Sequence, residues 1–500
     1  MDSQHHHALL TRLERDSERN PESYRARAAL LATAAHAALL LLGLLALIGT
    51  IKAAGQLLGG HLPAALILLT PAALLAALSW RLLRLRRPAP RGIPLNASQA
   101  PKLFAMLDKI QTRLEAPVLD QVILDDQCRV SIQRHARLGP LGRAHNTLFI
   151  GLPLMQVLSR KELAASLTHE YVQLTKPQDR LASWVLRNRA GWQQLHDLLG
   201  GSQPKPLDAL LLGLLRVYVA RLNAWSLPLA RQHTHAADQL AAEIVGAQTM
   251  ADALIATELR GRFINEEFWR GLWATADSQP APSYLPFGSM RTALNAGLPP
   301  ERAQTWLREA LQTSTSASDH QPSLQDRLLA LDTPAELPLE AAHCAAQSLF
   351  GEQLPLLQRR FDQRWLSDNE ESWRERHREV SAARDITRRL AGRDTHHFAP
   401  SELEHYAQAL ITVGRNAEAV PLLCRAADHP HGSARIALQA AHLLRSLGDE
   451  AAIHYFELAM DRDAQLIRDT TAQVVAFCTA RGDEDRASYY QDRLARLQAA

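Results

Sequence analysis

One stretch of the sequence places an imidazole and a carboxylate side by side in a helix-prone run. It reads AASLTHEYVQLT, spans residues 164–175, and contains His169 followed by Glu170. In the pattern H-E-x-x-H, two histidines one helical turn apart bind zinc and the glutamate between them acts as general base. Here Gln173 occupies the position of the second histidine. The stretch keeps one imidazole and the carboxylate of a hydrolytic zinc site and lacks the other imidazole.

The flanking residues predict the elements that position this pair. Ser159 followed three residues later by Glu162 forms a capping box, which predicts a helix over residues 159–173. Two apolar runs bounded by turn residues, DQVILDD at 120–126 and NTLFIGLP at 146–153, are the best strand candidates. Most later segments show helical spacing. We therefore expect a mainly helical fold with a small β-sheet, and the His-Glu pair on a helix just past an edge strand.

Length, charge and cysteine content bound the class of protein. The chain has 500 residues, 47% of them hydrophobic, which predicts two or three domains with a sizeable core. The formal charge of +3 leaves no basic excess to neutralise phosphates, so bulk nucleic-acid binding is not expected. Four cysteines lie far apart without a C-x-x-C pair, which indicates free thiols: Cys128, Cys344, Cys424 and Cys478.

The sharpest change in composition is near the N-terminus. Residues 28–51 form an uncharged apolar run long enough to cross about 30 Å of hydrocarbon, and residues 62–80 form a second. Buried core helices are the alternative, but the short connection between the runs favours a transmembrane helical hairpin over 28–87. The residues ahead of the first run are too polar for a cleavable signal peptide, and we treat 1–27 as an N-terminal tail.

The distribution of arginines predicts the orientation of this hairpin. Positive charge concentrates on the cytoplasmic side of membrane proteins, and only Lys52 lies between the two runs. We therefore expect both ends of the hairpin in the cytoplasm. The arginines on either side are Arg12, Arg15, Arg19, Arg25 and Arg27 before the first run, and Arg81, Arg84, Arg86, Arg87 and Arg91 after the second.

Three further stretches, taken with the hairpin, resemble a known family. They are APKLFAMLDKIQTRLEAPVLDQVILDD, LGRAHNTLFIGLPLMQVLSRKELAASLTHE and LARQHTHAADQLAAEIVG. Their order is similar to that of the HtpX and CAAX-prenyl-endopeptidase family of membrane-tethered zinc metallopeptidases, over roughly residues 28–335. The resemblance implies a zincin-like α+β domain, which we assign to 88–340, and a bacterial inner (cytoplasmic) membrane location with the soluble domains in the cytoplasm.

Carried over residue by residue, the resemblance implies a degenerate metal site. His169 matches the first zinc ligand and Glu170 the general base, whereas Gln173 replaces the second ligand. On the downstream helix Asp238 matches the aspartate that supports the site, and Thr234 replaces the third ligand, a glutamate. His169 and Glu170 are then vestigial.

The resemblance also marks positions beside the site. Cys128 and Arg129 replace an Asn-Ala pair that lies along the substrate, and Gln321 replaces the histidine of a His-Pro pair. The Cys128 thiol is expected to be inert rather than nucleophilic. The sharpest rescue of metal binding uses His233 or His235, which flank Thr234. Positions i and i+2 of a helix point to different faces, so at most one of the two can turn toward His169. A site of His169, Glu170 and His235 is then conceivable, but Glu170 would cease to be the base.

The last hundred residues carry a separate, periodic signal. Gly414, Gly448 and Gly482 are each 34 residues apart (448 − 414 and 482 − 448), between pairs of helical segments. This is the tetratricopeptide period, and each glycine is expected to end the first helix of its pair. We expect a tetratricopeptide-like α-α array over 399–500, with a plain helical bundle as the alternative, and a charged helical linker over 341–398.

Two functions from different classes are compatible with these patterns. In the first, the chain is an integral membrane pseudopeptidase with two spans and no cofactor, whose cleft and repeats bind protein or peptide clients. In the second, it is a zinc endopeptidase with a rearranged site. Neither involves nucleic acid, and metal content distinguishes them.

Overall fold

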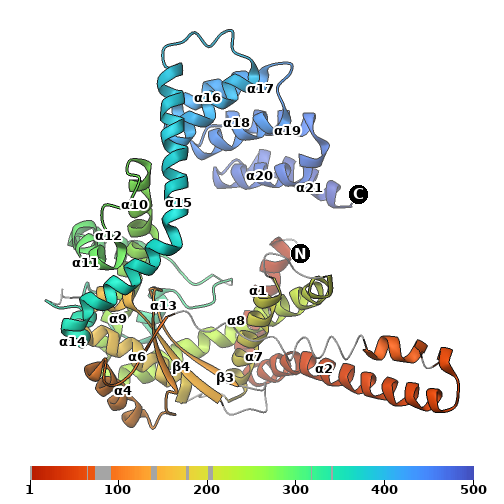
Figure 1. Ribbon diagram of the computed structural model, residues 1–500, viewed down its shortest axis with the longest axis vertical. Helices are drawn as coiled ribbons and strands as arrows, with labels where there is room; N and C mark the ends of the chain where they lie inside the picture. The colour runs from red at the N-terminus through yellow and green to blue at the C-terminus, as the bar shows by residue number, and fades with distance from the viewer. Residues whose placement is uncertain are drawn as a thin grey trace. The chain divides into compact units, whose positions relative to one another are not determined.

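The computed structural model describes residues 3–64, 66–73, 92–136, 144–175, 180–200, 206–316, 318–338 and 342–499. It is mainly helical with one four-stranded sheet, which confirms the predicted fold class at that level (Figure 1). The chain forms two compact units. One comprises Met1–Trp269 with Pro286–Gln363, and the other Arg270–Leu285 with Arg364–Ala500. The first unit thus extends beyond the boundary expected at residue 340.

The sheet belongs to the first unit and has the order β1-β2-β4-β3. Its strands are β1 (Ile93–Leu95), β2 (Gln121–Asp125), β3 (Val130–Ala136) and β4 (Ala144–Gly151). β1 runs antiparallel to β2, β2 parallel to β4, and β3 antiparallel to β4. The two predicted strands are β2 and β4, while β1 and β3 were not predicted. Among the described strands β3 pairs only with β4, so its other side is an open edge.

Gly151 lets the turn before β3 close against the end of β4. A Cβ atom at this position would lie 1.5 Å from the carbonyl oxygen of Gln127, a distance that no side chain could occupy. The Gly151 N–H instead donates a hydrogen bond of 2.8 Å to the Arg129 carbonyl. The absence of a side chain therefore fixes the path of the chain through Cys128 and Arg129 as it enters β3.

Helix α6 (Arg160–Thr175) begins at the predicted capping box. The Ser159 N–H donates to the Glu162 carboxylate over 2.5 Å, and the Glu162 N–H donates to the Ser159 hydroxyl over 3.2 Å. Both bonds satisfy main-chain donors that a helix leaves without partners at its start. The helix then packs against β3, an edge strand of the sheet (Figure 1). Its Glu170 side chain reaches the main chain of that strand.

The helices around α6 complete the first unit. α6 contacts α4, α8 and α9. Short helices precede α6 and follow α9 along the chain. Their bounds are α4 (Pro101–Leu114), α5 (Leu152–Val157), α7 (Arg180–Leu199), α8 (Pro206–Val245), α9 (Ala247–Arg262), a π-helical turn (Phe263–Phe268), α11 (Pro286–Gly297), α12 (Pro300–Ala310), α13 (Leu324–Ala330) and α14 (Ala345–Phe350).

The N-terminal region is helical from Ser3. α1 (Ser3–Arg19) buries Leu10 and Leu13, so this part of the expected tail is packed rather than solvated. α2 (Pro21–Leu58) follows, and its first turns pack on α7 and α8, where the Tyr24 hydroxyl donates to the Trp225 carbonyl over 2.7 Å.

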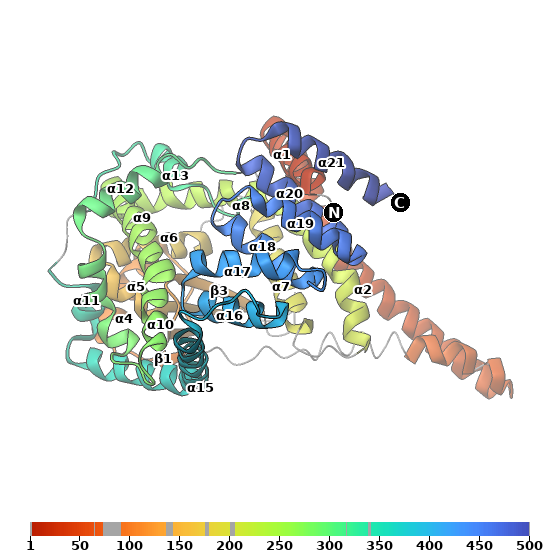
Figure 2. The same cartoon turned by 90° about the horizontal axis from the view of Figure 1, so that it is seen from above.

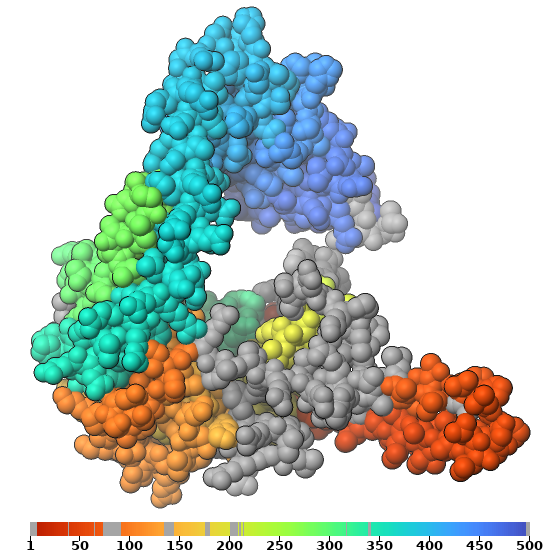
Figure 3. All heavy atoms as spheres, in the orientation of Figure 1, coloured from red at the N-terminus to blue at the C-terminus, as the bar shows by residue number. Residues whose placement is uncertain are grey.

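Beyond these turns α2 presents apolar side chains outward. Of the described residues, only α2 is long and apolar enough to cross a membrane, by length and composition. Its exposed side chains include Leu40, Leu44 and Ile51. Figure 3 shows this part of the chain as orange-red spheres at the lower right. The second run is described as a shorter apolar helix, Leu62–Ala73, and residues 74–91 with their arginines lie outside the described residues. The two-span hairpin therefore stays a prediction.

Most of the second unit consists of the expected charged helix and six C-terminal helices. α15 (Leu354–Leu390) begins in the first unit and continues into the second. Its interspersed tryptophans have a structural role, since Trp365 and Trp373 pack against Trp273 of α10 (Trp269–Ala274) at ring-centroid distances of 6.2 and 5.3 Å. An Arg376–Asp277 ion pair of 2.8 Å joins α15 to the turn that follows α10.

The C-terminal helices form three consecutive hairpins (Figure 2, blue). In each, the predicted glycine has a left-handed backbone just after the first helix, with φ of 82° at Gly414, 73° at Gly448 and 73° at Gly482. The glycine N–H and the next N–H both bond back to the helix end, for example Gly448 to Arg445 and Asp449 to Leu444. This pattern is a Schellman C-cap. The helices are α16 (Pro400–Thr412), α17 (Asn416–Asp428), α18 (Ala434–Ser446), α19 (Ala451–Arg462), α20 (Ile467–Ala480) and α21 (Glu484–Ala499).

Candidate functional site

Both nitrogens of the His169 ring are engaged by neighbouring side chains. Nδ1 lies 2.8 Å from Oδ1 of Asp238, an ion-pairing distance without hydrogen-bond alignment. Nε2 lies 2.7 Å from the amide nitrogen of Gln173 one turn further along α6. Because the Gln173 amide nitrogen can only donate, the Nε2 lone pair accepts from it, and we assign the ring proton to Nδ1, on the side of Asp238. Gln173 thus occupies the lone pair that a metal would need.

Asp238 ties three helices together. The carboxylate, fully buried on α8, accepts hydrogen bonds of 2.7 Å from both Nε and Nη2 of Arg327 on α13 and lies against His169 of α6. Burial raises the pKa of Asp238, but the hydrogen bonds and charge of Arg327, together with the adjacent His169, outweigh it and lower the pKa to about 2. The carboxylate is therefore ionised at neutral pH and forms a bidentate salt bridge with Arg327.

Glu170 faces the open edge of the sheet. Its Oε2 accepts a hydrogen bond of 3.0 Å from the main-chain N–H of Ile132, in the middle of β3. Burial raises the pKa of the Glu170 carboxyl above its usual range, opposed by the charge of His169 and by that hydrogen bond. The Glu170 carboxylate therefore accepts the hydrogen bond that the Ile132 N–H could otherwise donate to an added strand.

Thr234 and the two histidines that flank it on α8 have different surroundings. The Thr234 hydroxyl donates to the Ala230 carbonyl of its own helix over 3.0 Å. His233 lines the cavity around His169, whereas His235 is not among its lining residues and has a buried Nδ1 without a hydrogen-bond partner in the described chain. Burial lowers the pKa of His235, with the Asp238 charge acting in the opposite direction. His233, and not His235, thus lines the same cavity as His169.

A cavity of 520 Å³ joins most of the residues singled out from the sequence. These residues come from separate segments of the chain. Among them, burial raises the pKa of the Cys128 thiol to about 12, so this thiol stays protonated at neutral pH. Arg129 is exposed and lies 3.7 Å from Asp125. The lining includes Cys128, Arg129, His169, Glu170, Gln173, Thr234, Gln321 and Pro322.

A second cavity of 660 Å³ continues from the first along β3. The two share Glu170, Gln173, Leu186, Arg189 and His233. The second is bounded by Ile132, Gln133 and Arg134 on the strand and by α7 on the other side. Together they form a groove beside the open edge, which we call the β3 groove.

The residues around His169 do not fit a zinc ion. A catalytic zinc needs three strong protein ligands, but the Nε2 lone pair faces an amide N–H, the Thr234 oxygen is a weak neutral donor, and the Asp238 carboxylate is held by Arg327. No cluster of three or more His, Cys, Asp or Glu in the described chain has a metal-binding arrangement.

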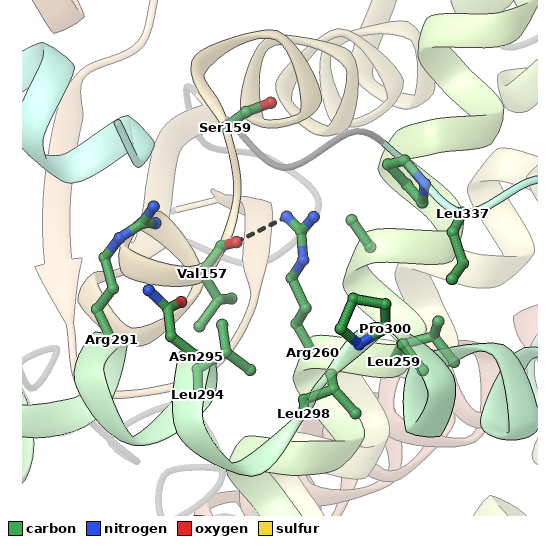
Figure 4. A pocket seen from close by; sticks show the side chains of 13 residues that line it. Val157, Ser159, Leu259, Arg260, Arg291, Leu294, Asn295, Leu298, Pro300 and Leu337 are labelled. Atoms are coloured by element: carbon green, nitrogen blue, oxygen red, sulfur yellow. Dashed lines mark hydrogen bonds between the residues drawn. The ribbon is translucent and has the colours of Figure 1, made fainter. Parts of the chain in front are cut away.

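A separate cavity of 300 Å³ is lined by polar groups that form structural contacts within the protein (Figure 4). Arg260 points to the Val157 carbonyl, which accepts its hydrogen bond of 2.8 Å, and also pairs with Glu162 of the α6 capping box at 2.9 Å. Leucines make up much of the remaining wall. None of its lining residues belongs to the β3 groove.

Four residues of the site were not singled out from the sequence. Arg327 holds Asp238, and Arg134, Arg187 and Arg189 line the groove. Arg327 lies 89 residues from its partner, so no local spacing could have paired them. The stretch SDHQPSLQDR, which contains Gln321 and Arg327, was the only signal near it.

A scan against protein-family models and searches of curated proteins and of solved structures found no match to this chain.

Proposed function

We propose that this chain is a membrane-anchored pseudopeptidase, which binds extended polypeptide in a peptidase-like cleft without hydrolysing it. The observation that carries the proposal is the contact of 2.7 Å between the Gln173 amide nitrogen and Nε2 of His169. In the resemblance to the HtpX family, a zinc ion is held by His169 and by the residue at position 173. An amide N–H there leaves neither a second imidazole nor a free lone pair on the first.

The loss of metal ligands leaves the binding surface of such a cleft. β3 has an open edge, and the Ile132 N–H points to it, since that group donates to Glu170 rather than to β4. In an antiparallel ladder, main-chain groups alternate between the two sides, so Val130 and Arg134 present theirs to the same edge. An extended peptide can add to such an edge by main-chain hydrogen bonds.

The anchoring part of the proposal rests on α2 and on the arginine distribution. A helix with outward-facing leucines and an apolar stretch of this length is favoured in a bilayer. The three C-terminal hairpins supply a second surface for a protein partner, in the manner of tetratricopeptide arrays, because their glycine caps recur with that period.

Metal content of the full-length protein in detergent tests the proposal. After incubation with zinc and gel filtration, we expect far less than one equivalent of zinc and no cleavage of casein. Gln173→His combined with Thr234→Glu should raise zinc affinity, because the pair restores three strong ligands with His169 while Glu170 remains available as base. Adding His169→Ala to that variant should abolish the gain, which controls for surface binding.

The opposite result has a defined form. Stoichiometric zinc in the unmodified protein that is lost on His169→Ala and on His235→Ala, but retained on Arg113→Gln, would favour the rearranged zinc endopeptidase instead.

A further inference from the structure

The β3 groove is rich in arginine. Its two cavities are lined by Arg129, Arg134, Arg187 and Arg189, and also by Arg327, which Asp238 already neutralises. The acidic residues along the same walls are Glu170, Asp197 and Glu258. Glu170 is bound to the Ile132 N–H, and Asp197 accepts from Gln193 over 3.1 Å. Arg129 is likewise paired with Asp125 at 3.7 Å. The cavity along β3 has three arginines, Arg134, Arg187 and Arg189, against the two carboxylates of Glu170 and Asp197, so this part of the groove has one positive charge in excess.

Two of these arginines come from opposite walls and repel each other. Arg134 lies on β3 and Arg187 on α7, and both side chains are exposed. The pKa of Arg187 is lowered by burial and by the charge of Arg134. Within the described residues neither side chain has an acidic partner. A negative group between the two walls would relieve this repulsion.

Arg189 is a positioned cation at the point where the two cavities meet. Its Nε donates to the Asn223 side chain over 3.0 Å, and Nη2 donates to Nδ1 of His320 over 2.6 Å. Both acceptors are neutral in these contacts, so they orient the guanidinium without cancelling its charge. The charge of Arg189 in turn lowers the pKa of His320, after burial, which keeps that ring neutral.

We propose that the β3 groove takes an acidic polypeptide segment in extended conformation, with its backbone on the open edge of β3 and its carboxylates against Arg134, Arg187 and Arg189. This inference rests on the proposed peptide-binding function and adds the chemical class of the partner. β3 has seven residues, so about seven residues of the partner can pair with it. Charge complementarity selects the sequence, whereas the strand edge selects the conformation.

The test uses the full-length protein in nanodiscs of neutral lipid and labelled peptides, with affinity read by fluorescence anisotropy. One peptide alternates threonine and aspartate, and a matched peptide has asparagine in place of every aspartate. We expect the acidic peptide to bind about tenfold or more tightly, with a difference that shrinks as salt screens the charges. Arg134→Gln combined with Arg187→Gln should remove most of the difference.

A matched control separates the groove from the overall charge. Arg113→Gln combined with Arg308→Gln removes two exposed arginines elsewhere in the same unit and should leave the preference unchanged. Peptides N-methylated at alternate amides test the strand edge. Methylation in one phase should abolish binding and in the other should not, because only every second amide faces β3.

The outcomes distinguish this inference from the function on which it rests. If neutral and acidic peptides bind equally well, or if the groove variant and the control variant behave alike, the acidic partner is wrong while peptide binding stands. If the acidic peptide binds regardless of which amides are methylated, the groove recognises negative charge without pairing to a strand. The inference that the partner binds in extended conformation is then wrong, and an anionic lipid headgroup would satisfy the same site. If no peptide binds, the proposed function itself fails.

Discussion

At the scale of single residues, contacts between helices hold the site together. Gln173 bonds to the ring nitrogen of His169 that a metal would use, and Arg327 binds the Asp238 carboxylate that lies against the same ring. Each of these side chains therefore has a structural role in the fold. The function proposed for the site is recognition of a peptide by a strand edge and by arginines.

Asp238 is expected to govern acid stability. Its pKa of about 2 is below the ordinary value of 3.8, so its contribution is fully present above about pH 4 and is lost as pH falls toward 2. The shift corresponds to about 2 kcal/mol. Asp238→Asn should lower the melting temperature of the full-length protein at neutral pH by several degrees, because it leaves Arg327 without a charged partner. It should also flatten the decline of stability between pH 4 and pH 2.

Thermal unfolding followed by tryptophan fluorescence measures both effects. Glu301→Gln, which removes an exposed carboxylate on α12, is the control and should change neither. An Asp238→Asn protein that melts like the control at neutral pH would show that the buried contact with Arg327 contributes little.

Glu170 is expected to compete with a bound peptide. Since its carboxylate occupies the Ile132 N–H, a peptide strand must displace it to complete the ladder. Glu170→Ala should strengthen binding of the uncharged peptide about fivefold, the value of roughly one net hydrogen bond. Glu258→Ala, in the same cavity, is the control. Weaker binding after Glu170→Ala would mean that the carboxylate contacts the peptide directly.

At the scale of elements, the C-terminal hairpins depend on their glycine caps. Gly448 has a φ of 73°, and a Cβ there would meet no atom within 4 Å, so any cost of a side chain comes from the backbone alone. Gly448→Ala should destabilise this hairpin by about 1 kcal/mol. Hydrogen exchange over residues 434–462 should become faster. Gly271→Ala, at a helical glycine of the same unit with equally open space, should not accelerate exchange.

At the scale of the whole molecule, the prediction concerns the membrane. The arginines before residue 28 and after residue 80 predict that both ends of the expected hairpin lie in the cytoplasm. A reporter fused after Arg91 should be active only as a cytoplasmic marker, and one inserted in the 52–61 loop only as an external marker. Identical labelling of the two positions would mean that α2 is the sole span or that neither run crosses.

The sequence by itself determined the elements whose signals are local. Apolar runs marked β2 and β4, the Ser159–Glu162 box marked the start of α6, and the 34-residue glycine spacing marked three helix ends. Each signal depends on neighbours within a few residues, where the chain's own geometry sets the contacts. β3 was missed because Ser131, Gln133 and Arg134 break its apolar pattern, as an exposed edge strand permits.

Only the tertiary structure decided what the site residues do. The Asp238–Arg327 and Ile132–Glu170 contacts join residues 89 and 38 positions apart, and they depend on how α6, α8, α13 and β3 pack. Sequence spacing left His233 and His235 as equal neighbours of Thr234, whereas the orientation of α8 brought His233 to the cavity. The arginines of the groove come from β3 and from α7, which are far apart in the sequence. Their charges lie close together only because β3 and α7 line the same cavity.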